Sequence, residues 1–379
     1  MKEKTERKAF KDWFDGDAAR RLGTQMQSAW PDFPVQTFEK LATRNLSTLE
    51  FHGRVGQFSD ALAATLPDDR VQALEILTRS LPPILPDAEA VTDGWLQWPL
   101  GQFIADHGLP EFDASMRAMI ELTQRFSSEF AVRPFVEQQP ESTFARLREL
   151  ATHPSPHVRR WCSEGVRPRL PWGKKLHALV KDPSPIWPIL EILKDDPETY
   201  VQRSVANCLN DIAKDHPEAV LERCRTWQTN AGPERTWIIR HALRSLIKSA
   251  HPEALDLMGY PPNARIETHL SADRKTLRIG ESVQLEATVH HPGKKSVNLM
   301  IDFVVSYVGK QGGQREKVFK WTTLVLKPGE TRILQKKVPF RPATVRALYP
   351  GPHAIQLQIN GTRQSRVELL LTSRTQIKT

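Results

Sequence analysis

Glu164 is an acidic residue surrounded by cationic ones, in the segment RRWCSEGVRPRLPWGKK. Arg160 precedes it by four residues, and Arg167 and Arg169 follow it. A surface that only binds anions gains nothing from a carboxylate that repels them, so Glu164 indicates chemistry that uses an ionised carboxylate. The alternative is a structural ion pair with Arg160, one helical turn earlier.

Glu121 has a similar environment. It lies beside the apolar stripe that contains Met119 and Ile120, with Arg117 and Arg125 each four residues away. Two arginine neighbours favour the ionised form of a carboxylate. Glu121 is therefore a second candidate for the same chemistry, and a surface ladder of ion pairs is the alternative.

The aromatic and acidic residues near these glutamates have two interpretations each. Trp161 follows Val158 and precedes Cys162, so it either packs in the core or offers a face for stacking. Asp211 is either a weaker third acid or part of a structural ladder, and the same ladder is the alternative for Arg203.

Sequence motifs of the common hydrolases and nucleotide-binding proteins are absent. The chain has no P-loop, dinucleotide fingerprint, HExxH or GxSxG, and its 12 histidines and three cysteines are scattered. A metal-dependent or serine hydrolase is therefore disfavoured, and no cofactor is expected.

Helices are predicted to position these residues. Before residue 262 apolar residues recur at intervals of three and four, as in RVQALEILTRSL and SMRAMIELTQRF. Superposing HVRRWCSEGVRP, YVQRSVANCLNDIAKDHPEAV and WIIRHALRSLIKSAHPEAL gives spacings of 43 and 37 residues. Units of about 40 residues made of paired helices are typical of HEAT-like repeats. Prolines in KDPSPIWP and KDDPE fit helix starts within such pairs.

Stacking these repeats predicts a polar column that could bind a phosphate backbone. Its first row is Arg160, Arg203 and Arg240, and its second row is Glu164, Asn207 and Arg244. Residues 145–175 add a basic cluster of eight lysines and arginines with two acidic residues.

The last third of the chain has the alternating pattern of strands. Seven runs rich in Val, Ile, Leu and Thr are separated by turns, among them the basic segments 292–295 and 309–317. Seven short strands in about 110 residues indicate an immunoglobulin-like sandwich. We therefore predict a multidomain chain, an all-α HEAT-like solenoid over 1–262 followed by an all-β immunoglobulin-like sandwich over 263–379.

Charge is divided unevenly between these two parts. The net charge is +9, but from Arg265 onward there are 20 lysines and arginines against 8 acidic residues. A domain this basic indicates a polyanionic partner, most simply nucleic acid. A highly charged solvated surface is the alternative.

The composition favours a cytoplasmic protein. Hydrophobic residues make up 39% and charged residues 26% of the chain, and no apolar run approaches the roughly 20 residues of a membrane-spanning helix. The charged start of the chain argues against a secretory signal, and the three cysteines do not form a disulfide framework.

Three segments resemble the AlkC type of bacterial DNA alkylation-repair glycosylase, within the AlkC/AlkD superfamily of HEAT-like repeat proteins. They are EFAVRPF (129–135), HVRRWCSEGVRPRLPWG (157–173) and YVQRSVANCLNDIAKDHPE (200–218). The seven-strand tail corresponds to the immunoglobulin-like domain that some members carry.

The resemblance implies a monofunctional glycosylase that cuts the N-glycosidic bond of 3-methyladenine and 3-methylcytosine in double-stranded DNA and leaves an abasic site. A cationic base is already a good leaving group, so the enzyme needs only to stabilise an oxocarbenium-like sugar and to align a water. It also implies that the repeats hold a bent duplex by its backbone, without base flipping. The expected protein is a cofactor-free, nucleoid-associated monomer.

On this basis we expect Glu121 and Glu164 to be the catalytic carboxylates, with Trp161 facing the sugar or base and Asp211 as a third acid. The residues expected to contact DNA are Arg133, Arg159, Arg160, Arg167, Arg169, Trp172, Lys174, Arg203, Asn207 and Arg240. A non-catalytic HEAT-repeat scaffold that binds DNA or protein is the alternative function.

Overall fold

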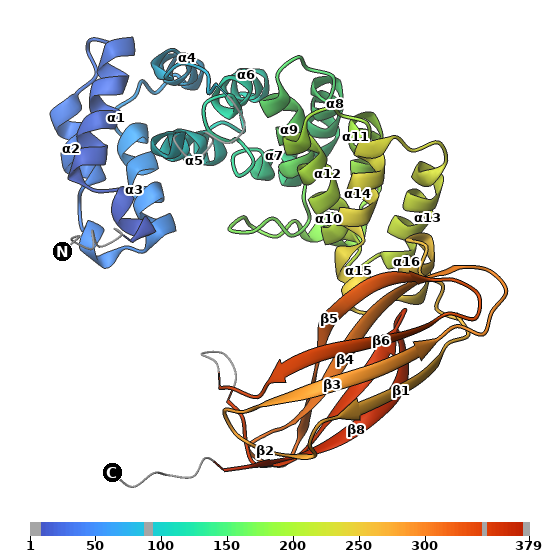
Figure 1. Cartoon of the computed structure of the whole chain (residues 1–379). Coiled ribbons are helices and arrows are strands. Elements are labelled where there is room, and N and C mark those ends of the chain that lie inside the picture. Colours follow the sequence, from blue (N-terminus) through green and yellow to red (C-terminus); the bar gives the residue numbers. More distant parts are fainter. Residues whose placement is uncertain (1–8, 87–93, 343–346, 374–379) are drawn as a thin grey trace, which may run out of the picture. The chain divides into compact units, whose positions relative to one another are not determined.

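The chain forms two compact units, Met1–Ala242 and Leu243–Thr379. The computed structural model (Figure 1) describes residues 9–86, 94–342 and 347–373. The change from helix to strand lies later than the division between the units, between Leu257 and Glu267. The second unit therefore begins with two short helices, and residue 262, where we predicted the domain boundary, lies in the connection that follows them.

The first unit is helical throughout its described residues, as the 3.6-residue periodicity predicts. Its helices are η1 (Phe10–Trp13), α1 (Gly16–Ala29), α2 (Val35–Ala42), η2 (Leu46–Thr48), α3 (Phe51–Ala63), α4 (Arg70–Ser80), α5 (Trp98–His107), α6 (Phe112–Thr123), α7 (Arg133–Gln138), α8 (Pro140–Leu150), α9 (Pro156–Glu164), α10 (His177–Lys181), η4 (Ser184–Ile186), α11 (Trp187–Leu193), α12 (Thr199–Ile212), α13 (Pro217–Gln228) and α14 (Pro233–Ala242).

Paired helices confirm the predicted repeats. The second helices α9, α12 and α14 pack side by side, and α8, α11 and α13 are the first helices of the three pairs (Figure 1). The three segments that the sequence aligns each include part of one of these second helices, and the third segment, residues 237–255, continues beyond α14. Arg244 lies beyond α14, however, and begins α15 (Arg244–Lys248), so the predicted second polar row ends at Asn207.

Prolines set where several of these helices begin. Pro156, Pro217 and Pro233 are the first residues of α9, α13 and α14, where the missing N–H leaves no hydrogen bond unmade. Pro188 is the second residue of α11, and Pro197 lies just before α12. Each proline ends one stretch of chain and directs the next into a new helix.

The apolar stripe of α12 fixes how this helix sits in the unit. Val201, Val205, Leu209 and Ile212 are all buried, while Arg203 on the other side is exposed. The same rotation places Ser204 and Asp211 inside the unit, where they reach the end of α9.

The second unit is a β-sandwich that follows α15 (Arg244–Lys248) and α16 (Pro252–Leu257). One sheet has the strand order β1-β3-β6 and the other β2-β8-β7-β4-β5. The strands are β1 (Glu267–Ala272), β2 (Thr276–Arg278), β3 (Ser282–His290), β4 (Val297–Val308), β5 (Gln314–Leu326), β6 (Thr331–Pro339), β7 (Gly351–Ile359) and β8 (Thr362–Thr372).

The core of the sandwich follows the alternation of its strands, with Leu285, Val305 and Ile355 fully buried. Two features differ from the sequence prediction. The short strand β2 pairs in parallel with β8 and was not predicted. Strand β5 begins at Gln314, so part of the expected basic turn at 309–317 is strand that pairs with β4. In the part of the chain that the structure describes, no helix is long and apolar enough to cross a bilayer.

Candidate active site

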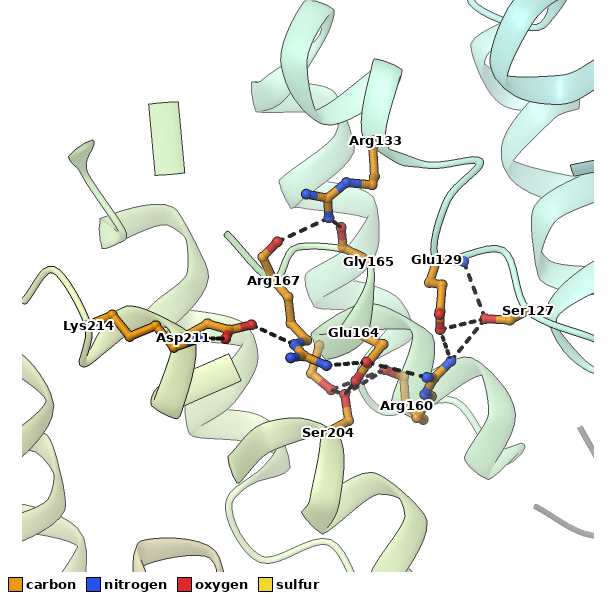
Figure 2. A network of polar contacts seen from close by, with 11 residues as sticks. Ser127, Glu129, Arg133, Arg160, Glu164, Gly165, Arg167, Ser204, Asp211 and Lys214 are labelled. Atoms are coloured by element: carbon orange, nitrogen blue, oxygen red, sulfur yellow. Dashed lines mark hydrogen bonds and ion pairs between the residues drawn. The ribbon is translucent and has the colours of Figure 1, made fainter. Parts of the chain in front are cut away.

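The side chain of Glu164, the last residue of α9, is buried among hydrogen-bond donors (Figure 2). Its Oε1 accepts a hydrogen bond from Arg167 Nη1 at 2.6 Å and lies 3.5 Å from Arg160 Nη2. Its Oε2 accepts a hydrogen bond from the Ser204 hydroxyl at 2.7 Å. Two helices and the segment after α9 therefore fix both oxygens of one carboxylate.

These contacts keep Glu164 ionised. Burial alone would raise the pKa of its carboxyl group, but the charges of Arg160 and Arg167 and the hydrogen bond from Ser204 outweigh burial and lower that pKa below 4.5. Glu164 is thus a buried negative charge at neutral pH. The ion pair with Arg160 that the sequence offered as an alternative is present, as one part of a larger network.

Arg160 joins Glu164 to a second carboxylate, that of Glu129. The Nη1 atom of Arg160 forms an ion pair with Glu129 and donates a hydrogen bond to the Ser127 hydroxyl at 2.9 Å. The Ser127 hydroxyl in turn donates to Glu129 Oε2 at 2.9 Å. Burial opposes the charge of Arg160, but Glu129 and Glu164 outweigh burial and raise its pKa.

On the other side of Glu164, Arg167 leads to Asp211. The Nε atom of Arg167 donates to Asp211 Oδ2 at 2.8 Å, and Asp211 Oδ1 accepts from Lys214 Nζ at 2.8 Å. Figure 2 shows the resulting series of alternating charges from Glu129 to Lys214. Asp211 is buried behind Arg167, so its carboxylate orients Arg167 and does not line the cavity described next.

Glu164 and Glu129 both line one cavity of about 390 Å³, named the Glu164 cavity below. Its other polar lining residues are Ser127, Arg160 and Arg167. Its walls are otherwise apolar and mostly aromatic, formed by Phe10, Trp13, Trp95, Trp98, Phe126, Phe130, Leu170, Pro171 and Trp172. Aromatic walls exclude water, and the face of an aromatic ring attracts cations, so this cavity suits a planar, cationic group next to a carboxylate.

Trp172 is the most exposed of these rings, with 59% of its surface accessible. It packs against Phe10 and Phe51 in T-shaped arrangements, with ring centroids 5.6 and 5.5 Å away. The backbone of Trp172 has a φ of +66°, which is a strained conformation for a bulky residue. Strain of this kind collects at functional sites. Trp172 is thus exposed at the Glu164 cavity, and its contact with DNA stays a prediction.

Arg133 does not lie on the surface as a DNA contact, because its side chain is buried. It donates hydrogen bonds to the backbone carbonyls of Gly165 and Arg167 at 3.0 Å each, and to that of Lys174 at 2.7 Å through Nε. Burial lowers its pKa to about 10, so it remains cationic at neutral pH. Arg133 therefore holds the segment that carries Arg167 and Trp172, a structural role in place of the expected one.

Trp161 is fully buried, so it cannot offer a face to sugar or base. Its position on the core side of α9 beside Val158 and Cys162 explains the burial, and of its two interpretations the core one is correct. Glu121 is not brought to the Glu164 cavity either. It forms an ion pair with Arg125 at 2.8 Å and lines a separate cavity between α4 and α6.

Most of the cations expected to bind DNA are neutralised by acidic partners. Arg159 pairs with Asp196, Arg169 with Asp215 and Lys174 with Glu137, while Arg160 and Arg167 belong to the glutamate network. Among the expected contacts, the exposed side chains are Trp172, Lys174, Arg203 and Arg240, and Asn207 is half-buried.

Glu129 and Ser204 were not among the site residues predicted from the sequence. Glu129 begins the segment EFAVRPF, and an acid that precedes Arg133 in a recognised segment was the available signal. The rings of Phe10, Trp13 and Trp98 were missed as well, although FKDWF and WLQW are dense in aromatic residues. The described residues contain no group of three or more His, Cys, Asp or Glu side chains that could hold a metal ion.

Comparisons with known proteins agree with this architecture. A family model described as the C-terminal Ig-like domain of the uncharacterised protein YhaZ matches residues 267–373. Over 353 residues the chain is 35% identical to the uncharacterised protein YhaZ of Bacillus subtilis (strain 168), covering 93% of this chain and 96% of that protein.

A solved structure extends the likeness to three dimensions. The alkylpurine DNA glycosylase AlkC of Pseudomonas fluorescens, bound to DNA containing an abasic site analog, matches with a TM-score of 0.82 and 34% sequence identity. The match covers 96% of this chain and 100% of that one. The chain therefore belongs to the AlkC-type family of HEAT-like repeat proteins with a C-terminal immunoglobulin-like domain, which includes AlkC of P. fluorescens and YhaZ of B. subtilis.

Proposed function

We propose that the protein is a monofunctional DNA glycosylase that hydrolyses the N-glycosidic bond of cationic N-alkylated bases in duplex DNA and leaves an abasic site. The observation that carries this proposal is the full-length likeness to an alkylpurine DNA glycosylase, with an ionised glutamate at the aromatic cavity. The proposed substrates are 3-methyladenine and 3-methylcytosine. The proposed protein acts as a cytoplasmic, nucleoid-associated monomer.

The chemistry of these substrates matches the groups that the cavity offers. An alkylated base carries a positive charge and leaves without protonation, so a general acid is not required. As the bond breaks, positive charge moves onto the sugar. The fixed negative charge of Glu164 stabilises that charge without any reorganisation, because Arg167 and Ser204 already hold its oxygens.

Glu129 takes the place that we had assigned to Glu121. It is the second carboxylate of the cavity and shares Arg160 with Glu164, so one of the two can stabilise the sugar while the other accepts a proton from the attacking water. We assign the stabilisation of the sugar to Glu164, because both of its oxygens are held. We assign the activation of the attacking water to Glu129.

DNA binding requires cations that are not already paired. Arg203 and Arg240 on the second helices and the basic sandwich strands are the proposed contacts to the phosphate backbone. Trp172 is the proposed contact at the lesion. A duplex held by its backbone and bent would bring the sugar to Glu164 without base flipping, at a cost set by DNA deformability.

Incubation of the purified protein with methylated DNA tests the proposal, with chromatographic measurement of released 3-methyladenine and 3-methylcytosine. Release of free base and accumulation of alkali-labile abasic sites are expected. Binding of the duplex without release of any base would instead support the non-catalytic scaffold.

A further inference from the structure

The two oxygens of Glu164 are held from different repeats. Arg160 and Arg167, on α9 and just after it, contact Oε1, whereas the hydrogen bond to Oε2 seen among the described residues comes from Ser204 on α12. The orientation of the carboxylate therefore depends on the packing of one repeat against the next.

Ser204 is itself fixed by a second hydroxyl. It is buried, and its Oγ lies 2.7 Å from Ser163 Oγ and 2.7 Å from Glu164 Oε2. A hydroxyl has one proton, and an ionised carboxylate can only accept. Ser204 therefore donates to Glu164 and accepts from Ser163, in a short chain in which each hydrogen bond strengthens the next.

Without this hydroxyl, the two guanidinium groups would attract Glu164 toward one side only. Oε2 would lose its donor in a buried environment, where an unmatched charged acceptor is costly. The carboxylate would then rotate toward Arg160 and Arg167, and its charge would be less well placed for a sugar in the cavity.

We propose that Ser204 is a positioning residue: its hydroxyl holds Oε2 of Glu164 and thereby keeps the carboxylate oriented at the Glu164 cavity. The inference rests on the proposed function, because it names how that site is held. It extends the active site to α12, a helix that does not line the cavity.

Several charged or titratable groups lie near Glu164. Arg160 lies on α9 and Arg167 after it, Tyr200 and Asp211 lie on α12, and Glu129 lies before α7. A Ser204 variant keeps all of these residues. A change in the pKa of Glu164 in that variant therefore reports the lost hydroxyl.

The test compares Ser204→Ala with Ser163→Ala in the full chain. Both changes remove one buried hydroxyl of the same size, but only the first removes a donor to Glu164. Carboxyl carbon NMR of protein with labelled glutamate, assigned with Glu164→Gln, measures the titration of Glu164 directly and needs no catalysis. Single-turnover base release and affinity for duplex with an abasic-site analog complete the comparison.

We expect Ser204→Ala to raise the pKa of Glu164 and to slow base release by about 10-fold with unchanged DNA affinity, the size expected for one hydrogen bond to a charged group. Ser163→Ala, which leaves the donor to Glu164 in place, should change both by clearly less. An unchanged titration in folded Ser204→Ala, or equal losses in the two variants, would overturn the inference.

Two further controls cover a Ser204→Ala variant that does not fold and a wild type that releases no base. If Ser204→Ala does not fold, Ser204→Cys fills the site with a somewhat larger side chain and a weaker donor, and it must also raise the pKa of Glu164 for the inference to hold. If the wild type releases no base, the proposed function fails, while the NMR titration still decides the role of Ser204.

Discussion

Replacing Glu164 by glutamine removes one buried charge and changes the size of the side chain very little. The amide can still accept a hydrogen bond from Ser204 or Arg167, but it no longer offsets the charges of both arginines that surround it. The cavity thus becomes more positive where the sugar would develop positive charge.

The magnitude follows from electrostatics. Two unit charges about 4 Å apart interact by about 4 kcal/mol at an effective dielectric of about 20, and each 1.36 kcal/mol is tenfold in rate, which gives about 10³-fold. Loss of one preorganised stabiliser in other enzymes costs about 10²–10³-fold. We therefore expect Glu164→Gln to slow base release by about 10²–10³-fold.

The rate of 3-methyladenine release under single-turnover conditions, with enzyme in excess over methylated duplex, measures this effect. It does not depend on the later dissociation of the abasic DNA product. Affinity for the duplex should be unchanged or tighter, since a negative charge is lost. Thermal unfolding checks that the variant is folded, because the change leaves a buried arginine without one of its partners.

Glu121→Gln is the matched control. Glu121 also lies on a helix with an arginine one turn away, but it lines the other cavity and is half-exposed. Its loss should change the rate by no more than about 3-fold, as expected for an exposed ion pair. A rate for Glu164→Gln close to that of the wild type, or equal losses in both variants, would refute the reasoning.

Three further changes probe the rest of the network. Glu129→Gln should slow base release by about 10-fold or more if this residue activates the water. A normal rate at saturating DNA would leave Glu164 as the sole catalytic carboxylate of the cavity. Arg133→Met should lower the free energy of unfolding by about 3 kcal/mol, because it leaves three backbone carbonyls without their donor; chemical denaturation measures this, and an unchanged midpoint would contradict it. Because the folded-state pKa of Glu164 is depressed, its contribution to stability is present above the unfolded value near 4.5 and is lost as the pH falls through the lower folded value. The difference in unfolding free energy between wild type and Glu164→Gln should therefore shrink only in acid, and a difference that is constant down to acid unfolding would argue against that depressed pKa.

The local pattern determined the elements and their order. Periodicity of three and four residues identified the helices, and alternation identified most strands, because one buried face is enough to impose either pattern. The repeat spacing alone aligned residues of α9, α12 and α14, since stacked second helices bury equivalent positions. The basic charge of the last third is likewise a property of composition.

The sequence by itself also placed Glu164 among arginines, because one helical turn brings residues four apart together. It could not choose between Glu121 and Glu129. Both have an arginine four residues away, at Arg125 and Arg133, but Arg133 turns inward to backbone carbonyls while Arg160, 31 residues further on, reaches Glu129.

Only the tertiary structure decided which side chains face the cavity. The rings of Phe10, Trp98 and Trp172 come from segments far apart in the chain, and Trp161 is enclosed while Trp172 is open. Burial and long-range contacts depend on how helices pack against each other, which the spacing of residues along one helix does not specify. The protein's elements were therefore determined locally, and the electrostatics of its site were set by contacts between repeats.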